Sequence, residues 1–278
     1  MASRDDLRAL AAENHEIFDL GLYEAPDGTV VDIEDALIAM MAQTRVIDMS
    51  AETTDGRYPG QTRISLASET TVAGIDRLSV EGEFSVCVLN FASARSPGGG
   101  YLRGGNAQEE ALCRATTLYP ALAAQAAYYH LNKGWPTAIY SDALIYSPNV
   151  LLIRDEHGTL RPDPVPMAVI TAPAPNVRAL AETGLSEKLG SDVAASLALR
   201  VERILATACA YGHDSVVLGA WGCGVFGNPP DLVAGLFSDA LSGPFEGCFK
   251  RVHFAVPGRD GDPNQTVFTA RFGPPLPS

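Results

Sequence analysis

Apolar residues recur at helical intervals along several stretches of the chain, and this spacing predicts helices. The first stretch ends at Gly21, a residue typical of helix C-termini, and a longer stretch runs from Val193 to Gly212. Their apolar faces are formed by Leu7, Leu10, Ala11, Ile17 and Leu20 and by Val193, Leu197, Val201, Ile204, Leu205 and Ala208. Helices are predicted at about residues 4–20, 33–43, 69–78, 107–118, 120–131, 193–212 and 230–241, with Pro120 favouring the break between two of them.

Short runs of nearly continuous apolar residues predict buried strands, of which Ser85 to Asn90 is the clearest. Strands are predicted at about residues 62–66, 85–90, 143–146, 150–154, 167–171, 215–218, 250–256 and 266–272. Strands and helices alternate after residue 60, which predicts a layered α/β sheet with ligand contacts in the loops that follow the strands. The turn-forming residues 53–60 mark the expected join between an N-terminal extension and the core.

The composition is that of a globular protein, since 46% of the 278 residues are hydrophobic and 19% are charged. No apolar run approaches the roughly 20 residues that a membrane span needs, and the first ten residues are charged, so we expect a soluble, cytoplasmic protein. The five cysteines are scattered, which indicates neither a disulfide framework nor a zinc site. The five histidines show no metal-ligand spacing either, and we expect no metal and no cofactor.

The net charge of −13 opposes direct binding to DNA and to acidic membranes, because such binding depends on lysine and arginine. A phosphate-containing ligand would therefore have to be held locally. Backbone N–H groups in glycine-rich turns or at helix N-termini can do this without net positive charge.

Two glycine-rich tracts each follow a predicted strand and precede a helix. In the first, Gly98, Gly99 and Gly100 are consecutive, and the loss of backbone entropy on folding favours a position where a ligand approaches the main chain. The second contains Gly222, Gly224 and Gly227 in a G-x-G-x-x-G spacing, which alone is weak evidence. A dinucleotide-binding fold would need this motif early in the domain and an acidic residue about 20 positions later, and neither condition is met.

Glu109 and Glu110 follow Gln108 at the start of a predicted helix. Acidic residues favour the first turn of a helix for electrostatic reasons alone. Their closeness to the first glycine tract favours a functional interpretation, in which one carboxyl group enters a ligand cleft and the other holds a hydroxyl group or orients the first. Adjacent, buried carboxyl groups disfavour each other's ionisation, so that one can keep the proton that a glycosidic general acid needs.

The string PGGGYLRGGNAQEE resembles the signature of the poly(ADP-ribose) glycohydrolases, and NFASARSPGGG resembles their bacterial branch. The segments TRISLASETT, ITAPAPN and LGAWGCGVFGN are further matches in the same order, over roughly residues 60 to 256. This resemblance implies a macrodomain-like three-layer α/β/α sandwich with a mixed central sheet. Residues 61–278 would form the ADP-ribose-binding catalytic core, and residues 1–60 a helical extension packed on it.

The same resemblance assigns roles to residues of this chain. Glu110 is similar to the catalytic acid and base, while Glu109 and Gln108 resemble residues that hold the scissile ribose and orient that acid. Phe226 resembles the aromatic residue that packs on the distal ribose. The loops that clamp the diphosphate correspond to Gly98, Gly99 and Gly100 and to Gly222, Cys223, Gly224, Val225 and Phe226. Ser93 stands where the animal enzymes have asparagine, which puts hydroxyl recognition by this position in doubt.

For each of three further residues, two interpretations remain open. Glu69 lies in the segment that resembles the adenine side of the site, but glutamate is also common where a helix starts. Trp221 either lines the cleft or packs in the core. Arg103 lies near the ligand or is an exposed loop charge.

The implied reaction is hydrolysis of the ribose–ribose O-glycosidic bonds of poly(ADP-ribose), with release of ADP-ribose, and the bacterial resemblance implies cleavage from chain ends. Poly(ADP-ribose) and ADP-ribose are the expected partners, and oligomeric state cannot be read from the sequence. An ADP-ribose reader without catalysis is the main alternative, although readers lack the sequence Gln-Glu-Glu. A nucleotide-binding oxidoreductase based on Gly222 to Gly227 is a third possibility.

Overall fold

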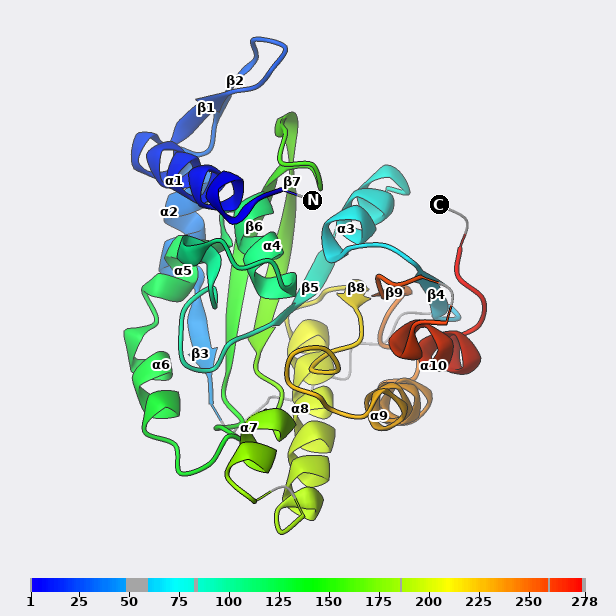
Figure 1. Cartoon of the computed structure of the whole chain (residues 1–278). Helices are drawn as coiled ribbons and strands as arrows, with labels where there is room; N and C mark the ends of the chain where they lie inside the picture. The colour runs from blue at the N-terminus through cyan, green and yellow to red at the C-terminus, as the bar shows by residue number, and fades with distance from the viewer. Residues whose placement is uncertain (1, 49–59, 83–84, 186, 260, 277–278) are drawn as a thin grey trace.

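The computed structural model describes residues 2–48, 60–82, 85–185, 187–259 and 261–276. Apart from Gly60, the predicted turn at residues 53–60 lies outside the described residues. The central sheet has seven strands in the order β3-β6-β7-β5-β8-β9-β4 (Figure 1). These strands are β3 (Arg45–Ile47), β4 (Arg63–Ala67), β5 (Val86–Phe91), β6 (Leu144–Arg154), β7 (Leu160–Ala172), β8 (Ser215–Leu218) and β9 (Arg251–Ala255).

The sheet is mixed, as expected. Strands β7, β5, β8, β9 and β4 are parallel to one another, whereas β6 is antiparallel to both β7 and β3. Parallel neighbours bring the carboxyl ends of their strands to one edge of the sheet. The loops after β5, β8 and β9 therefore meet at that edge.

Helices cover both faces of the sheet, which makes the three-layer sandwich that the sequence predicts (Figure 1). On β5, Val86 and Val88 point to one helical layer, and Cys87 and Leu89 point to the other. The first layer contains α1 (Arg4–Leu20), α2 (Glu34–Gln43), α3 (Thr71–Val80), α4 (Gln108–Ala115), α5 (Leu118–Ala123) and α6 (Ala126–Lys133). The second contains α7 (Val177–Glu182), α8 (Gly190–Ala210), α9 (Pro230–Ser242) and α10 (Pro263–Phe272).

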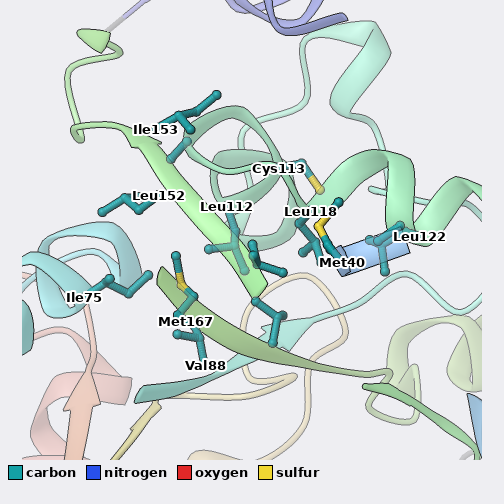
Figure 2. Packing of buried hydrophobic residues seen from close by; sticks show 14 of the residues in the cluster. Met40, Ile75, Val88, Leu112, Cys113, Leu118, Leu122, Leu152, Ile153 and Met167 are labelled. Carbon is teal, nitrogen blue, oxygen red and sulfur yellow. The ribbon is translucent and has the colours of Figure 1, made fainter. Parts of the chain in front are cut away.

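The N-terminal segment shares its core with the rest of the chain. Met40 of α2 is fully buried and packs with Leu118 and Leu122 of α5 in the cluster that also holds Val88 (Figure 2). The segment is not wholly helical, because it contains the hairpin of β1 (Leu22–Glu24) and β2 (Val30–Asp32) and supplies the edge strand β3. Its first helix begins at a capping box of Ser3 and Asp6. That helix ends at Gly21 as predicted, with φ of 69°.

Three sequence predictions are corrected by the structure. Residues 266–272 form most of helix α10 rather than a strand, since Asp262 accepts hydrogen bonds from Asn264 and Gln265 and Pro263 occupies the first helical position. Residues 143–146 and 150–154 belong mostly to one strand, β6, which is irregular where Pro148 lacks an N–H and Asn149 has a φ of 58°.

The third correction concerns the region after the first glycine tract. Two helices were predicted there, and the structure has three. Pro120 lies inside the first turn of α5, where its missing N–H leaves no helical hydrogen bond unmade. The break falls instead at Thr116 and Thr117, where the hydroxyl of Thr116 donates to Leu112 O and accepts from the N–H of Leu118.

Candidate active site

A cavity of about 460 Å³ opens at the carboxyl edge of the parallel strands. This volume lies in the range of sites that bury small organic ligands. The lining comes from loops after β5, β8 and β9 and from the first turns of α3 and α4. It includes the predicted residues Ser93, Gln108, Glu109, Glu110, Gly222, Gly224, Val225 and Phe226.

Gln108 attaches the start of α4 to the end of β5. Its side-chain oxygen accepts a hydrogen bond from the N–H of Phe91 at 2.8 Å, and its amide donates to Leu89 O at 2.9 Å. The same amide donates to the hydroxyl of Thr71 at the start of α3. Because its donors and acceptors are used within the protein, Gln108 fixes the position of the two glutamates that follow it.

Glu109 is buried, with 3% of its surface exposed. Its carboxyl group accepts hydrogen bonds from the N–H of Ser93 at 2.7 Å and from the amide of Asn90 at 3.3 Å. Burial raises the pKa of Glu109 to about 8, opposed by the N–H of Ser93 and reinforced by the nearby Glu110. Near pH 7 Glu109 therefore retains its proton, whereas the role of general acid was assigned to Glu110.

The carboxyl group of Glu110 lies between the first glycine tract and the helix start. One oxygen accepts from the N–H of Gly100 at 2.7 Å, and the other accepts from the N–H of Ala107 at 2.9 Å. These two bonds hold the carboxyl group at the cavity wall. A Cβ atom at Gly105 would lie 3.0 Å from the Glu110 side chain, so this glycine also leaves room for it.

The first glycine tract surrounds the carboxyl groups and is not among the residues that line the cavity. Gly98 and Gly99 have φ values of 62° and 58°, which explains the requirement for glycine. A Cβ atom at Gly99 would lie 2.5 Å from Glu110 Oε1 and 2.9 Å from Glu109 Oε2. The N–H of Gly100 and the space beside Gly99 are thus taken up by the glutamates, and a contact between this tract and the diphosphate stays a prediction.

Helix α1 contacts the residues that flank this tract in the structure. Asn14 of α1 is fully buried, donates to Arg114 O at the end of α4, and accepts from Arg154 of β6 at 2.8 Å. The hydroxyl of Tyr101, directly after the tract, donates to Ala11 O. Arg114 in turn donates to Gly105 O and to the side chain of Asn106. The extension is thus part of the framework that positions Glu110.

The second glycine turn lines the cavity with its main chain. Gly222 has a φ of 74°, and a Cβ atom there would collide with the side chains of Ala174 and Asn228. Asn228 holds the turn by donating to Pro175 O at 2.8 Å and to Gly222 O at 3.0 Å. Within the described residues, no acceptor bonds the N–H groups of Gly224, Val225 and Phe226. Successive free N–H groups of this kind form an anion-binding turn.

Two predicted residues lie outside the lining of the cavity, and the hydroxyl of a third binds within its own loop. Glu69 is not among the cavity-lining residues, since its carboxylate binds Arg77 and lies 2.7 Å from Nε2 of the buried His253. The structure thus gives no support to a contact between Glu69 and the adenine base. Cys223 lines an adjoining hollow and not the main cavity, and its thiol donates to Trp221 O at 3.6 Å. The hydroxyl of Ser93 accepts from the N–H groups of Arg95 and Ser96 and so closes the turn before the glycines.

The structure bears on both open alternatives. Trp221 is fully buried in the core and its indole N–H donates to Ala172 O at 2.9 Å, and the same residue also borders the cavity. Arg103 is exposed and donates to Gly99 O at 3.3 Å, behind the carboxyl pair.

Two contacts of the site were missed in the sequence analysis. Asn90 is fully buried and binds both Glu109 and the hydroxyl of Thr171. In the sequence, Asn90 is the polar residue at the end of an otherwise apolar predicted strand, and this position could have indicated its role in the site. Thr71, which accepts from Gln108, is the first residue of α3. The described residues contain no cluster of side chains suited to a metal ion, and none of their helices is long and apolar enough to cross a membrane.

A mixed sheet between two helical layers, with adjacent glutamates and a glycine turn bordering a cavity at the strand ends, defines a macrodomain-like glycoside hydrolase. The family model of the microbial-type PARG catalytic domain, where PARG stands for poly(ADP-ribose) glycohydrolase, matches residues 11–155. The chain belongs to this microbial-type poly(ADP-ribose) glycohydrolase family. This membership decides against the oxidoreductase alternative.

Solved structures of bacterial enzymes are similar over most of the chain. The poly(ADP-ribose) glycohydrolase of Thermomonospora curvata is 40% identical, with a TM-score of 0.89 over 96% of this chain and 100% of that chain. The same enzyme bound to the inhibitor ADP-HPD gives a TM-score of 0.87 at 40% identity over the same shares of both chains. The enzyme of Deinococcus radiodurans in complex with ADP-ribose is 40% identical, with a TM-score of 0.76 over 84% of this chain and 96% of that chain. A comparison with curated protein sequences finds no match.

Proposed function

We propose that this protein hydrolyses the ribose–ribose O-glycosidic bonds of poly(ADP-ribose) with Glu110 as the acid and base of the reaction. The observation that carries the proposal is the Glu110 carboxyl group at the wall of the cavity that Gly222, Gly224 and Phe226 also line. Relatives with 40% identity bind ADP-ribose and ADP-HPD, which supports the same class of ligand here.

In the first step, the Glu110 carboxyl proton passes to the 2′-oxygen of the neighbouring unit as the bond from ribose C1 to that oxygen breaks. Positive charge develops on the ribose as an oxocarbenium-like centre. In the second step, the Glu110 carboxylate takes a proton from water while the water oxygen bonds to C1. Glu110 is then protonated again, and the products are free ADP-ribose and a chain shorter by one unit.

This path needs a single acid and base, in contrast to glycosidases that place carboxyl groups on both faces of the sugar. Glu109 adjoins Glu110 in sequence and is bound by the N–H of Ser93, so it is unsuited to attack from the opposite face. Burial raises the pKa of Glu109 to about 8, and the neutral carboxyl can donate a hydrogen bond to a ribose hydroxyl. The diphosphate, held by the free N–H groups of Gly224, Val225 and Phe226, would stabilise the positive charge.

The test is the isosteric variant Glu110→Gln, with Glu202→Gln on the exposed side of α8 as the matched control. We expect Glu110→Gln to lower kcat by at least about 10³-fold, a typical loss for a residue essential to the chemical step. Its affinity for ADP-ribose, measured by calorimetry, should stay within about twofold, because the diphosphate contacts of the second turn remain. Release of ADP-ribose from the polymer at an appreciable rate by this variant would contradict the assignment.

Further parts of the proposal follow from the family resemblance and from composition. Cleavage should start at chain ends, so that ADP-ribose monomers are the first products; shorter polymers as first products would contradict this. The scattered spacing of the five cysteines indicates no disulfide framework, which supports a location in the reducing cytoplasm. Residues 1–60 are proposed to act as an extension packed on the catalytic core of residues 61–278.

A further inference from the structure

A second hollow adjoins the cavity at the glycine turn. The two share Gly224, Val225 and Asn264, and the second is completed by Arg178, Cys223 and residues at the start of α9. Val225, at their common wall, is 67% exposed. A ligand that fills the cavity therefore has a direct way past Val225 into this hollow.

Arg178 is held against the turn. Its backbone N–H donates to Phe226 O at 3.1 Å, and its side chain lies over Gly227. A Cβ atom at Gly227 would lie 3.1 Å from Arg178 Cγ and 3.4 Å from its Nε, so the glycine makes room for the arginine. Among the described residues that line the hollow, Arg178 is the one with a charged side chain.

The other polar groups of the hollow do not compete with this charge. Burial raises the pKa of the Cys223 thiol to about 12, so the thiol is neutral. Asn228 is 1% exposed, and within the described residues its carbonyl oxygen has no hydrogen-bond partner. Helix α9 starts at Pro230 with Pro229 as its N-cap residue, and neither has an N–H group, so this helix end offers an anion fewer donors than usual. Among the described side chains of the hollow, Arg178 is therefore the one that can offer positive charge to an anion, next to the free N–H groups of Gly224 and Val225.

We propose that this hollow binds a phosphate group of the ADP-ribose unit adjacent to the one in the cavity, with Arg178 as its cationic contact. The inference rests on the proposed function, because that function makes the ligand a chain with two phosphates in every unit. The main cavity is lined by glutamates and by no lysine or arginine among the described residues. A protein with a net charge of −13 repels such a polyanion, and an arginine at the exit of the cavity offsets this repulsion locally.

Binding is measured first, in the Glu110→Gln background, so that the polymer is not consumed. Poly(ADP-ribose) of defined length and ADP-ribose are each titrated against this protein and against versions that also carry Arg178→Ala, Arg178→Lys or Arg63→Ala. Arg63 is the matched control, an exposed arginine at the opposite, amino-terminal end of β4. Every alanine variant removes one positive charge, so long-range electrostatics change equally.

Arg178→Ala is expected to weaken polymer binding about fivefold at low salt, the size of effect typical of one partly exposed charge contact. The slope of log affinity against log salt concentration should decrease by about 0.7, the value for one phosphate contact in a single-stranded polyanion. ADP-ribose affinity should be unchanged, because that ligand is held in the main cavity. Arg178→Lys should retain most of the polymer affinity, and Arg63→Ala all of it.

Three results would each overturn the inference: polymer affinity unchanged by Arg178→Ala, an equal loss of ADP-ribose affinity, or an equal effect of Arg63→Ala. The second result would mean that Arg178 contacts the ADP-ribose unit inside the cavity. The third would mean that the loss of affinity comes from the change in net charge alone. The proposed function fails by a different observation, the absence of ADP-ribose release by the unmodified protein. The binding comparison does not require turnover and so separates the two failures.

Discussion

The two glycine turns of this protein each follow a parallel strand, and they differ in what their N–H groups bind. In the first turn, the N–H groups of Gly98 and Gly100 go to the carboxyl groups of Glu109 and Glu110, and that of Gly99 goes to Ser96 O. In the second, the N–H groups at 224–226 have no acceptor among the described residues. The first turn therefore binds the protein's own acids, and the second remains free for an external anion.

The two turns are also supported by different parts of the chain. The first is backed by α1, through Asn14 and the contact between Tyr101 and Ala11. The second is backed by the loop after β7, which the fully buried Arg200 of α8 holds by donating to Pro173 O at 2.7 Å. Changes at the first turn should therefore affect the chemical step, and changes at the second should affect ligand affinity.

The largest expected effect comes from Gly99→Ala. The new Cβ atom would occupy the space between both carboxyl groups, in a backbone conformation that disfavours alanine. We expect kcat to fall about 10³-fold while ADP-ribose affinity changes little, since misplacement of a catalytic group by about 1 Å already costs about 10²-fold. Gly184→Ala, which has a similar φ but open surroundings, is the control for backbone strain alone. A loss confined to affinity would reverse the roles of the two turns.

Gly222→Ala should produce the complementary defect at the second turn. The added methyl group collides with Ala174 and Asn228 and displaces the free N–H groups. We expect ADP-ribose affinity to fall about 30-fold, corresponding to about 2 kcal/mol of lost charge-assisted hydrogen bonding. Calorimetric titration measures this, and Gly224→Ala, whose Cβ would meet nothing within 4 Å, tests whether the collision is the cause. Unchanged affinity in Gly222→Ala would show that this turn does not hold the ligand.

Glu109→Gln tests how far the buried, ionisable carboxyl group of Glu109 lowers the free energy of unfolding. The folded protein holds the Glu109 proton with a pKa of about 8, against an ordinary value of 4.5 in the unfolded chain. Above pH 4.5 the unfolded chain releases this proton first, so the free energy of unfolding should decrease as pH rises from about 5 to about 8. Denaturant unfolding should show the glutamine variant to be more stable than the parent by about 2 kcal/mol or more at pH 9. Parallel pH curves of the two proteins would contradict the shifted pKa.

Asn14→Ala should give the smallest effect, because it acts through the support of the first turn. The variant leaves Arg114 O and the Arg154 side chain each without one buried partner. We expect the free energy of unfolding to fall by about 1–2 kcal/mol and kcat to fall several-fold, with ADP-ribose affinity retained. Asn228→Ala at the second turn is the counterpart and should lower affinity rather than kcat. Equal effects of both variants on kcat would remove the functional distinction between the two supports.

Local sequence patterns determined the class of fold and brought attention to the carboxyl pair. Strand β5 was recognisable because its run of apolar residues is buried on both faces, and α8 because its spacing follows one helical face. Helix α10 was misread as a strand because its short apolar run was judged apart from Asp262 and Pro263, which start the helix. That error came from interpretation, since the residues that start the helix, Asp262 and Pro263, are visible in the sequence.

The adjacency of Gln108, Glu109 and Glu110 was visible in the sequence, and so was their place beside a glycine tract. Only the tertiary structure decided that this tract binds the glutamates while the other turn keeps free N–H groups, because both are glycine-rich loops that follow a strand and precede a helix. Which of two carboxyl groups is buried, and what lies behind it, depends on helices and strands far apart in the chain, such as α1 beneath the first turn. A sequence records which groups are available, and packing over long distances determines which of them meet.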